Sequence, residues 1–425
     1  MVEIIESCLV APIQETPKHK IWLSNFDFNV SRYHVPLIYV YRADGDRNLF
    51  PVEAMKAALA KALVAFYPLA GRLVADWDGR PEIDCTGDGV LFVLARSNRS
   101  IKEFGDFAPS PEIRQMLVPS VESADPPSIL FMVQVTLFKW NWVTLGIGLH
   151  HMATDGKSLF HFINYWANIT RGITELATPP FLDRAALRSR TPPNADLFRD
   201  AGHNLNSTTA TAKLIQSSIL KLSGGQVTLL KDRSKQQSTF RAVVAHVWRC
   251  ACMVRGLTPD QVTRVYLVVD VRKRLNPPLP DGYFGNAVCR VSAIATAREI
   301  MSSSISFGAD KIRCAIDRVT DAYVRSAIDY VELQKNEGKI ESYANRFSTA
   351  DLIANSWLAF PTHDVDFGCG KPEFMGRAIM LAGGIVYVVS DKDGGVSIPI
   401  SLEMPNMERF KKVFYEELKH GVSCM

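Results

Sequence analysis

Two strand-like runs that almost touch in the sequence constrain the fold of this chain most. Residues 131–138 and 142–150 are rich in β-branched and aromatic side chains, with only a short polar break between them, and such a pair predicts a β-hairpin. Shortly after it, apolar residues recur at helical spacing over 158–169. We therefore expect a core strand, a loop and a helix in direct succession, with His151 in the loop.

The other expected elements alternate less regularly. Strands are expected at 37–41, 262–269, 356–360, 385–389 and 396–402, and helices at 52–66, 238–254, 309–337 and in a last segment running through Phe410. Because the elements mix without a strict βαβ rhythm, the pattern predicts an α/β fold with mixed sheets. A stretch rich in Pro and Asn predicts a linker over 191–212, between an N-terminal half over 1–190 and a C-terminal half over 213–425.

Composition and charge exclude several classes of protein. The chain has 425 residues, of which 47% are hydrophobic, so disordered, collagen-like and coiled-coil chains are excluded. Its 48 Lys and Arg against 44 Asp and Glu give a net charge of +4, which is too dilute for a nucleic-acid-binding surface. The 8 Cys lack the CxxC spacing or nearby His cluster of a zinc site. Without a basic leader or an apolar run of about 18 residues, the chain is expected to be cytoplasmic, with no membrane segment.

The segment 151–156 offers the side chains for base catalysis. The imidazole of His151 has an ordinary pKa near neutrality and can act as a general base, and the carboxylate of Asp155 can fix the local turn. On the residues alone, the commoner interpretation of such a histidine is a hydrogen-bonded polar group of the core. Ser158 nearby leaves a serine hydrolase open, although the G-x-S-x-G motif is missing.

Other charged and Gly-rich segments are weaker signals. Arg272 and Arg274 lie two apart at an expected strand end, so they face the same way and are candidate partners for Asp155. Residues 366–370 read as a tight turn. Gly146-Ile147-Gly148 resembles half of a dinucleotide fingerprint, but its third Gly and following acidic residue are missing.

Taken together and in order, three segments resemble the plant BAHD acyl-CoA-dependent acyltransferases. They are 151–156 (HMATDG), 270–280 (DVRKRLNPPLP) and 366–372 (DFGCGKP). Further matching segments span the whole length, at 15–17, 66–72, 180–184, 238–240, 246–249 and 282–286. Within the family, the chain is most similar to the hydroxycinnamoyl-CoA transferases, which include shikimate/quinate enzymes and their amine-acylating relatives.

The resemblance implies two chloramphenicol-acetyltransferase-like domains with a channel between them, the first of which includes a return segment near 358–382. It implies that His151 takes the proton from the acceptor as the acceptor attacks the acyl-CoA thioester. No metal or redox cofactor is implied, and the protein is expected to be a monomer whose only partners are acyl-CoA and a small acceptor. The residues implied to support the site are Asp155, Gly156, Arg272, Arg274, Asp366, Gly368 and Gly370.

The resemblance also implies two sets of binding residues. The acceptor pocket would include His34, Leu37, Tyr39, Ala359 and Cys369, and coenzyme A would meet the region of Lys231, Ser238 and Thr239. Cys369 stands where the family has Trp, so the channel wall loses an indole and its N–H donor. This departure motivates one alternative, a relative that binds CoA esters with weakened turnover.

A second departure concerns the acceptor. Ala359 stands where shikimate and quinate enzymes carry an Arg that binds the acceptor's carboxylate, so an amine is favoured over shikimate. The acidic residues that could attract an amine are Asp27, Asp364, Glu373 and Glu403. The alternative is O-acylation of shikimate, quinate or another alcohol, with a different cation such as Arg346 or Arg377 replacing the missing Arg.

Overall fold

The computed structural model describes residues 2–42, 50–76, 79–120, 129–175, 177–200, 214–338 and 348–420. The chain divides into two compact units, each assembled from three stretches. The first unit contains Met1–Ser189, Pro277–Ala287 and Phe360–Ile379, and the second contains Arg190–Asn276, Val288–Ala359 and Met380–Met425. The stretch Pro277–Ala287, which lies within the C-terminal half expected from the sequence, thus belongs to the first unit.

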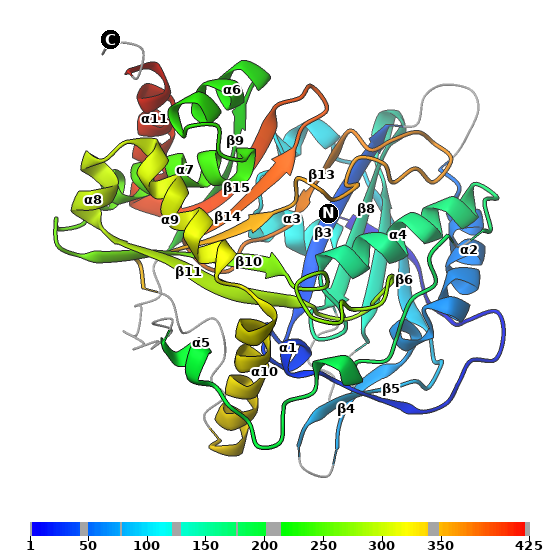
Figure 1. The fold of residues 1–425 in the computed structure, drawn as a ribbon. Coiled ribbons are helices and arrows are strands. Elements are labelled where there is room, and N and C mark those ends of the chain that lie inside the picture. Colours follow the sequence, from blue (N-terminus) through cyan, green and yellow to red (C-terminus); the bar gives the residue numbers. More distant parts are fainter. Residues whose placement is uncertain are drawn as a thin grey trace. The chain divides into compact units, whose positions relative to one another are not determined.

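A mixed sheet is the core of the first unit (Figure 1). Among the described residues it has six strands, in the order β1 (Val2–Val10), β6 (Val90–Ser97), β7 (Phe131–Leu137), β8 (Trp142–His150), β3 (His34–Arg42) and β13 (Phe374–Arg377). Only β6 and β7 pair in parallel, and the other neighbours are antiparallel. The predicted hairpin is confirmed as β7 and β8. A small sheet beside it contains β2 (Lys20–Trp22), β5 (Pro81–Asp84) and β4 (Arg72–Ala75).

Helices cover both faces of the first sheet. The longer helices of this unit are α2 (Val52–Ala65) and α4 (Gly156–Thr170), which the indole N–H of Trp166 joins by donating to the carbonyl of Met55 at 2.8 Å. On α4, Phe162 packs edge-on against Phe131 of the sheet. The short helical segments are α1 (Asn25–Phe28), η2 (Tyr67–Ala70), η3 (Ile101–Phe104), α3 (Pro111–Leu117), η4 (Lys139–Asn141) and η5 (Ala185–Leu187).

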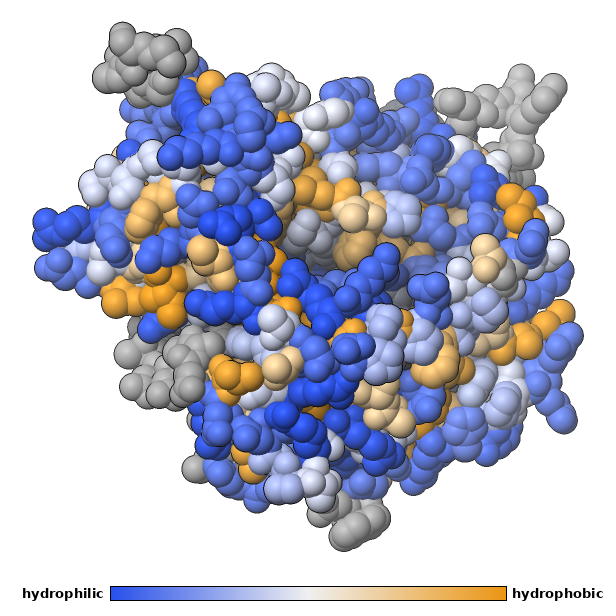
Figure 2. Space-filling view, viewed as in Figure 1, coloured by the Kyte–Doolittle hydropathy of each residue, from blue (hydrophilic) through white to orange (hydrophobic). Residues whose placement is uncertain are grey.

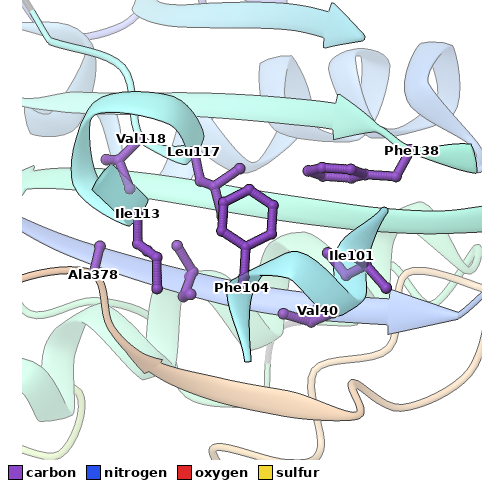
Figure 3. Packing of buried hydrophobic residues seen from close by; sticks show 9 residues of the cluster. Val40, Ile101, Phe104, Ile113, Leu117, Val118, Phe138 and Ala378 are labelled. Atoms are coloured by element: carbon purple, nitrogen blue, oxygen red, sulfur yellow. The ribbon is translucent and has the colours of Figure 1, made fainter. Parts of the chain in front are cut away.

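On the opposite face, η3 and α3 close a hydrophobic cluster (Figure 3). Val40 of β3 faces Phe104, Ile113 and Leu117 from these two segments. The neighbouring strand β8 carries Gly146, where an added Cβ would lie 1.7 Å from the carbonyl oxygen of Leu117. The missing side chain therefore lets the end of α3 lie directly on the sheet, a packing role unrelated to the dinucleotide fingerprint.

The second unit contains another mixed sheet. In the described part of the chain it has six strands, in the order β11 (Val288–Thr296), β10 (Val262–Asp270), β12 (Leu352–Ser356), β14 (Ile385–Ser390), β15 (Val396–Glu403) and β9 (Ile215–Leu222). Its helices are α5 (Asp196–Asp200), α6 (Gly224–Arg233), α7 (Thr239–Arg255), α8 (Ala297–Ser302), α9 (Ile305–Asp317), α10 (Asp321–Asn336) and α11 (Met404–His420). As the Ser238-Thr239 start predicted, Ser238 caps α7 by accepting the N–H of Arg241.

Three local predictions were wrong. The expected helix 309–337 is two helices: α9 ends at Asp317, and Thr320 then caps α10 by accepting the N–H of Tyr323. The expected strand 356–360 begins where the observed strand ends, since β12 covers Leu352–Ser356. Arg272 and Arg274 follow the end of β10 in a turn, so strand alternation does not make them face the same way.

The expected linker 191–212 is only partly described. Its first part contains helix α5, and the backbone N–H groups of Arg190 and Asn194 donate to the carboxylate of Asp329 in α10 at 2.9 and 2.8 Å. These contacts bind the segment to the second unit. Residues 201–212 of the predicted linker lie outside the described residues.

The face of the molecule shown in Figure 2 is mainly hydrophilic, and its apolar residues form small separate patches. Scattered apolar side chains of this kind are normal on a folded protein. Over the described ranges, no helix combines the length and the apolarity needed to cross a lipid bilayer.

Candidate active site

The loop that carries His151 joins two elements of the first unit. Strand β8 ends at His150, and α4 begins at Gly156. Asp155 is the N-cap of α4, and its Oδ1 accepts the N–H of Ser158 at 3.1 Å. Its Oδ2 accepts the N–H of Ala287 at 3.0 Å. One buried carboxylate therefore both starts the helix and binds the loop to the stretch 277–287.

Hydrogen bonds also hold the main chain of the loop. The N–H of His151 donates to the carbonyl of Tyr33 at 3.2 Å, and its own carbonyl accepts Nδ2 of Asn286 at 2.9 Å. Two residues further on, the carbonyl of Ala153 accepts Nη2 of Arg184 at 2.7 Å. The loop is thus fixed by groups from three distant parts of the first unit.

Neutral histidines lie next to His151. The ring of His150 meets that of His34 edge-on, with 5.2 Å between centroids. Burial, together with the neighbouring His34 and His151, lowers the pKa of His150 to about 3. Burial also lowers the pKa of His34, whose Nε2 donates to the carbonyl of Ile129. Near neutral pH both rings are therefore uncharged.

Ser158 has a structural role. Its buried hydroxyl lies 3.1 and 3.2 Å from the carbonyl oxygens of Tyr283 and Gly285, inside the first turn of α4. A hydroxyl that donates to main-chain carbonyls in this way is not activated by a base. The serine hydrolase alternative thus has no nucleophile at this position.

Three of the five predicted acceptor-pocket residues lie on β3, and they fall on both of its faces. Because side chains alternate along a strand, His34 lies on the face of Val40 and α3, whereas Leu37 and Tyr39 lie on the face of α4. Tyr39 is fully buried, and among the described residues its hydroxyl has no hydrogen-bond partner. Ala359 is exposed just after β12 of the second unit.

Cys369 belongs to the predicted turn at Asp366. The Oδ1 of Asp366 accepts the N–H groups of Gly368 and Gly370 at 2.7 and 2.9 Å. Burial and the nearby Asp366 raise the pKa of the half-buried Cys369 thiol to about 12, so the thiol is neutral near pH 7.

The remaining predicted site residues lie in the second unit. The guanidinium of Arg272 lies 3.3 Å from the Asp270 carboxylate, and Arg274 donates to the carbonyls of Ile316 and Val319. Of the residues assigned to coenzyme A, Lys231 is on α6, and Ser238 and Thr239 begin α7. The predicted pairing of Asp155 with an arginine and the predicted coenzyme A contacts stay predictions.

Sequence reasoning missed three residues that bind the His151 loop or its partners. Arg184 and Asn286 end two of the segments quoted for the family resemblance, 180–184 and 282–286, but neither had been given a role. For Asp27 the sequence suggests only an acid that could attract an amine. In the structure, its buried carboxylate lies 2.9 Å from the Arg184 guanidinium.

Comparison with known proteins agrees with this architecture. A family profile described as "Transferase family" matches residues 1–417. Putrescine hydroxycinnamoyltransferase 1 of Oryza sativa subsp. japonica is 44% identical, with 98% of this chain and 99% of the relative covered. Shikimate O-hydroxycinnamoyltransferase of Nicotiana tabacum is 41% identical, over 98% of this chain and 99% of that one.

The fold is similar to that of a solved structure with bound coenzyme A. TRI101 of F. graminearum, solved with coenzyme A and T-2 mycotoxin, superposes with a TM-score of 0.81 at 18% identity, over 93% of this chain and 97% of that one. The two mixed-sheet units thus have the two-domain, chloramphenicol-acetyltransferase-like fold. The chain belongs to the BAHD family of acyl-CoA-dependent acyltransferases.

Proposed function

We propose that this chain transfers a hydroxycinnamoyl group from its coenzyme A thioester to the nitrogen of an amine, such as a polyamine, agmatine or an arylamine. His151 takes a proton from the nitrogen as the new C–N bond forms at the thioester carbonyl. The tetrahedral oxyanion then collapses, the C–S bond breaks, and coenzyme A leaves as a thiolate. The proton taken from the nitrogen is then on the imidazole of His151. Because a thiolate is a good leaving group, one base suffices.

The similarity to hydroxycinnamoyltransferases over nearly the whole chain supports the donor. The names of these two relatives differ in the acceptor, which is putrescine in one and shikimate in the other. At about 40% identity to each, overall similarity does not choose between them, so the acceptor has to be argued from single residues.

The choice of an amine as the acceptor rests on Ala359. It stands where the shikimate and quinate enzymes of the family place an Arg, and its methyl group cannot pair with a carboxylate. It follows Trp357, whose ring packs against Tyr387 with 4.7 Å between centroids. A carboxylate that is desolvated without a cation costs several kcal/mol, whereas an uncharged amine avoids this cost.

The structure shortens the list of acids that could attract an amine. Asp27 is fully buried against Arg184, and Glu403 is buried against Arg255, so both carboxylates are already compensated. Asp364 and Glu373 are exposed, and although Asp364 lies 2.8 Å from the ammonium of Lys371, both members of that pair are open to water, where such a pair is weak. These two remain the candidates.

One observation favours the alternative, O-acylation of shikimate or quinate. Arg377 of β13 is buried and lies directly opposite Leu37 of β3. Residues opposite each other in an antiparallel pair share a face, so a cation lies beside a predicted acceptor residue. Arg346, the other cation considered, lies outside the described residues.

The test compares acceptors side by side. Wild-type protein is assayed with p-coumaroyl-CoA and, in turn, putrescine, agmatine, an arylamine, shikimate and quinate, with products identified by mass spectrometry. We expect kcat/KM to be higher for an amine than for shikimate, and to rise with pH as free amine accumulates. Ala359→Arg should shift the preference towards shikimate, and Arg377→Met should leave amine transfer in place.

Other outcomes would contradict parts of the proposal. A wild-type preference for shikimate or quinate that Arg377→Met abolishes would establish the alternative acceptor, with Arg377 as its cation. Binding of p-coumaroyl-CoA without turnover on any acceptor would instead identify the weakened relative that Cys369 suggested.

A further inference from the structure

We propose that a buried network of Asp27, Arg184 and Asn286 positions His151 for proton transfer by holding the main chain of its loop. The inference rests on the function proposed above, in which His151 is the base. All three residues belong to the first unit. They come from segments separated by more than a hundred residues, and none lies in the motif 151–156 or in the turn at Asp366.

Asp27 is the centre of the network. It lies in α1, where it completes a capping box with Ser24, whose N–H and hydroxyl approach Oδ2 at 2.8 and 2.6 Å. The same oxygen lies 2.9 Å from Nη1 of Arg184. The other oxygen, Oδ1, accepts the backbone N–H of Asn286 at 2.7 Å and its Nδ2 at 2.9 Å. Both carboxylate oxygens are therefore fully occupied, and Asp27 orients its two neighbours.

Arg184 and Asn286 each use a second contact to bind the loop. Nη2 of Arg184 donates to the carbonyl of Ala153, and Nδ2 of Asn286 donates to the carbonyl of His151. The Arg184 guanidinium also packs on the backbone of Gly285, where an added Cβ would lie 3.1 Å from Nε. The guanidinium of Arg184 and the side-chain amide of Asn286 thus each link one loop carbonyl to the buried carboxylate of Asp27.

Because these carbonyls are held in place, the position of the His151 Cα, from which the side chain extends, is fixed as well. The N–H of His151 is bound to Tyr33 and its carbonyl to Asn286, so the peptide groups on both sides of its Cα are restrained. A general base must lie within hydrogen-bond reach of the proton it takes, and a shift of about 1 Å can cost about a hundredfold in rate. These contacts reach the main chain only, so the network positions the base and does no chemistry itself.

The second unit offers a matched control. The side chain of Arg255 is also buried, lies 3.2 Å from the carboxylate of Glu403, and donates to the carbonyl of Asp351 at 2.9 Å. It repeats the contacts of Arg184 (a buried carboxylate and one main-chain carbonyl), but both of its partners, Glu403 and Asp351, belong to the second unit. Arg255→Lys therefore measures what the loss of such a fork costs the fold alone.

The experiment measures kcat and KM with p-coumaroyl-CoA and the best acceptor found above, for Asn286→Ala, Arg184→Lys and Arg255→Lys, each in the wild-type and the His151→Ala background. We expect Asn286→Ala and Arg184→Lys to lower kcat by about ten- to a hundredfold, with KM for the acyl-CoA unchanged. In the His151→Ala background, where the base is gone, they should cause no further loss. Arg255→Lys should lower the melting temperature and leave kcat unchanged.

Two results would overturn the inference. One is an unchanged kcat in folded Asn286→Ala and Arg184→Lys, and the other is an equal loss in both backgrounds, which indicates a purely structural role. Should Asn286→Ala not fold, Arg184→Lys decides, because it keeps a positive charge beside Asp27 but lacks the fork.

Failure of acyl transfer itself is recognised separately, because wild type would then turn over none of the acceptors, amines and alcohols alike. In that case the NMR signals of the His151 ring, assigned by their loss in His151→Ala, provide the test. They should shift in Asn286→Ala and Arg184→Lys and stay in place in Arg255→Lys. Signals that stay in place in all three variants would contradict the inference.

Discussion

Burial changes what individual histidines can do in this protein. His246 lies in the segment 246–249 quoted for the family resemblance, but in the structure it is a core residue of α7. Its Nε2 donates to the carbonyl of Phe414 on α11 at 2.9 Å. Burial lowers the pKa of His246 to about 4, so this ring is a neutral link between two helices.

We predict that His246 makes the protein less stable in acid. Its pKa is lower in the folded than in the unfolded chain, so the unfolded chain binds the extra proton and stability falls as pH drops from about 6.5 to about 4. The loss should reach about 3 kcal/mol below that range. His246→Gln, which keeps an N–H donor for Phe414, should remove this share of the slope in denaturant unfolding measured from pH 4 to 7. Equal slopes in the two proteins would contradict the prediction.

Contacts between elements depend on positions whose local sequence signal is small. Strand β8 meets α3 at Gly146, and Gln134 of β7 adds a hydrogen bond from Nε2 to the carbonyl of Met116 at 2.8 Å. The prediction of one helix over 309–337 was wrong for a similar reason, because the boundary between the two helices depends on a single residue. Apolar periodicity continues across the break, whereas the cap at Thr320 depends on a single hydroxyl.

We predict that Gly146→Ala destabilises the first unit by about 1–3 kcal/mol or more, because the new methyl group would overlap the Leu117 carbonyl and force α3 off the sheet. The control is Gly225→Ala in α6, where an added Cβ meets only the Ser223 hydroxyl at 4.0 Å. Alanine is the better helix former there, so stability should stay the same or rise slightly. Equal unfolding midpoints for wild type and Gly146→Ala would contradict this account.

Across the whole molecule, stretches that are distant in the sequence belong to the same structural unit. The first unit takes Pro277–Ala287 and Phe360–Ile379 from the later part of the chain. These stretches supply Asn286 and Ala287, which hold the His151 loop, and strand β13, which pairs with β3. A split of the chain near residue 190 therefore does not separate two complete folding units.

We predict that a chain ending at residue 189 does not fold cooperatively. Without residues 277–287, the carboxylates of Asp27 and Asp155 lose donors, and without β13 the β3 edge of the sheet is left unpaired. Circular dichroism should show no sharp thermal transition for residues 1–189. Full-length protein measured under the same conditions is the control. A cooperative transition in the shortened chain would mean that the two later stretches are dispensable.

Local patterns in the sequence were enough to predict much of the fold. The hairpin of β7 and β8, helix α4 after it, and α7 behind Ser238 were predicted because periodicity and caps depend on neighbouring residues. Motif order was enough to predict the family. The acceptor pocket stays a prediction, and strand alternation puts His34 on the opposite face of β3 from Leu37 and Tyr39.

The sequence by itself determined the family, the mixed α/β architecture and the candidate base His151, because each is written in contiguous residues. Only the tertiary structure decided what holds that base. Asp27, Arg184 and Asn286 meet around one buried carboxylate although long stretches of chain separate them. No local sequence pattern predicts this cluster. It depends on which hydrogen-bond donors the folded chain brings to a carboxylate that is buried away from water.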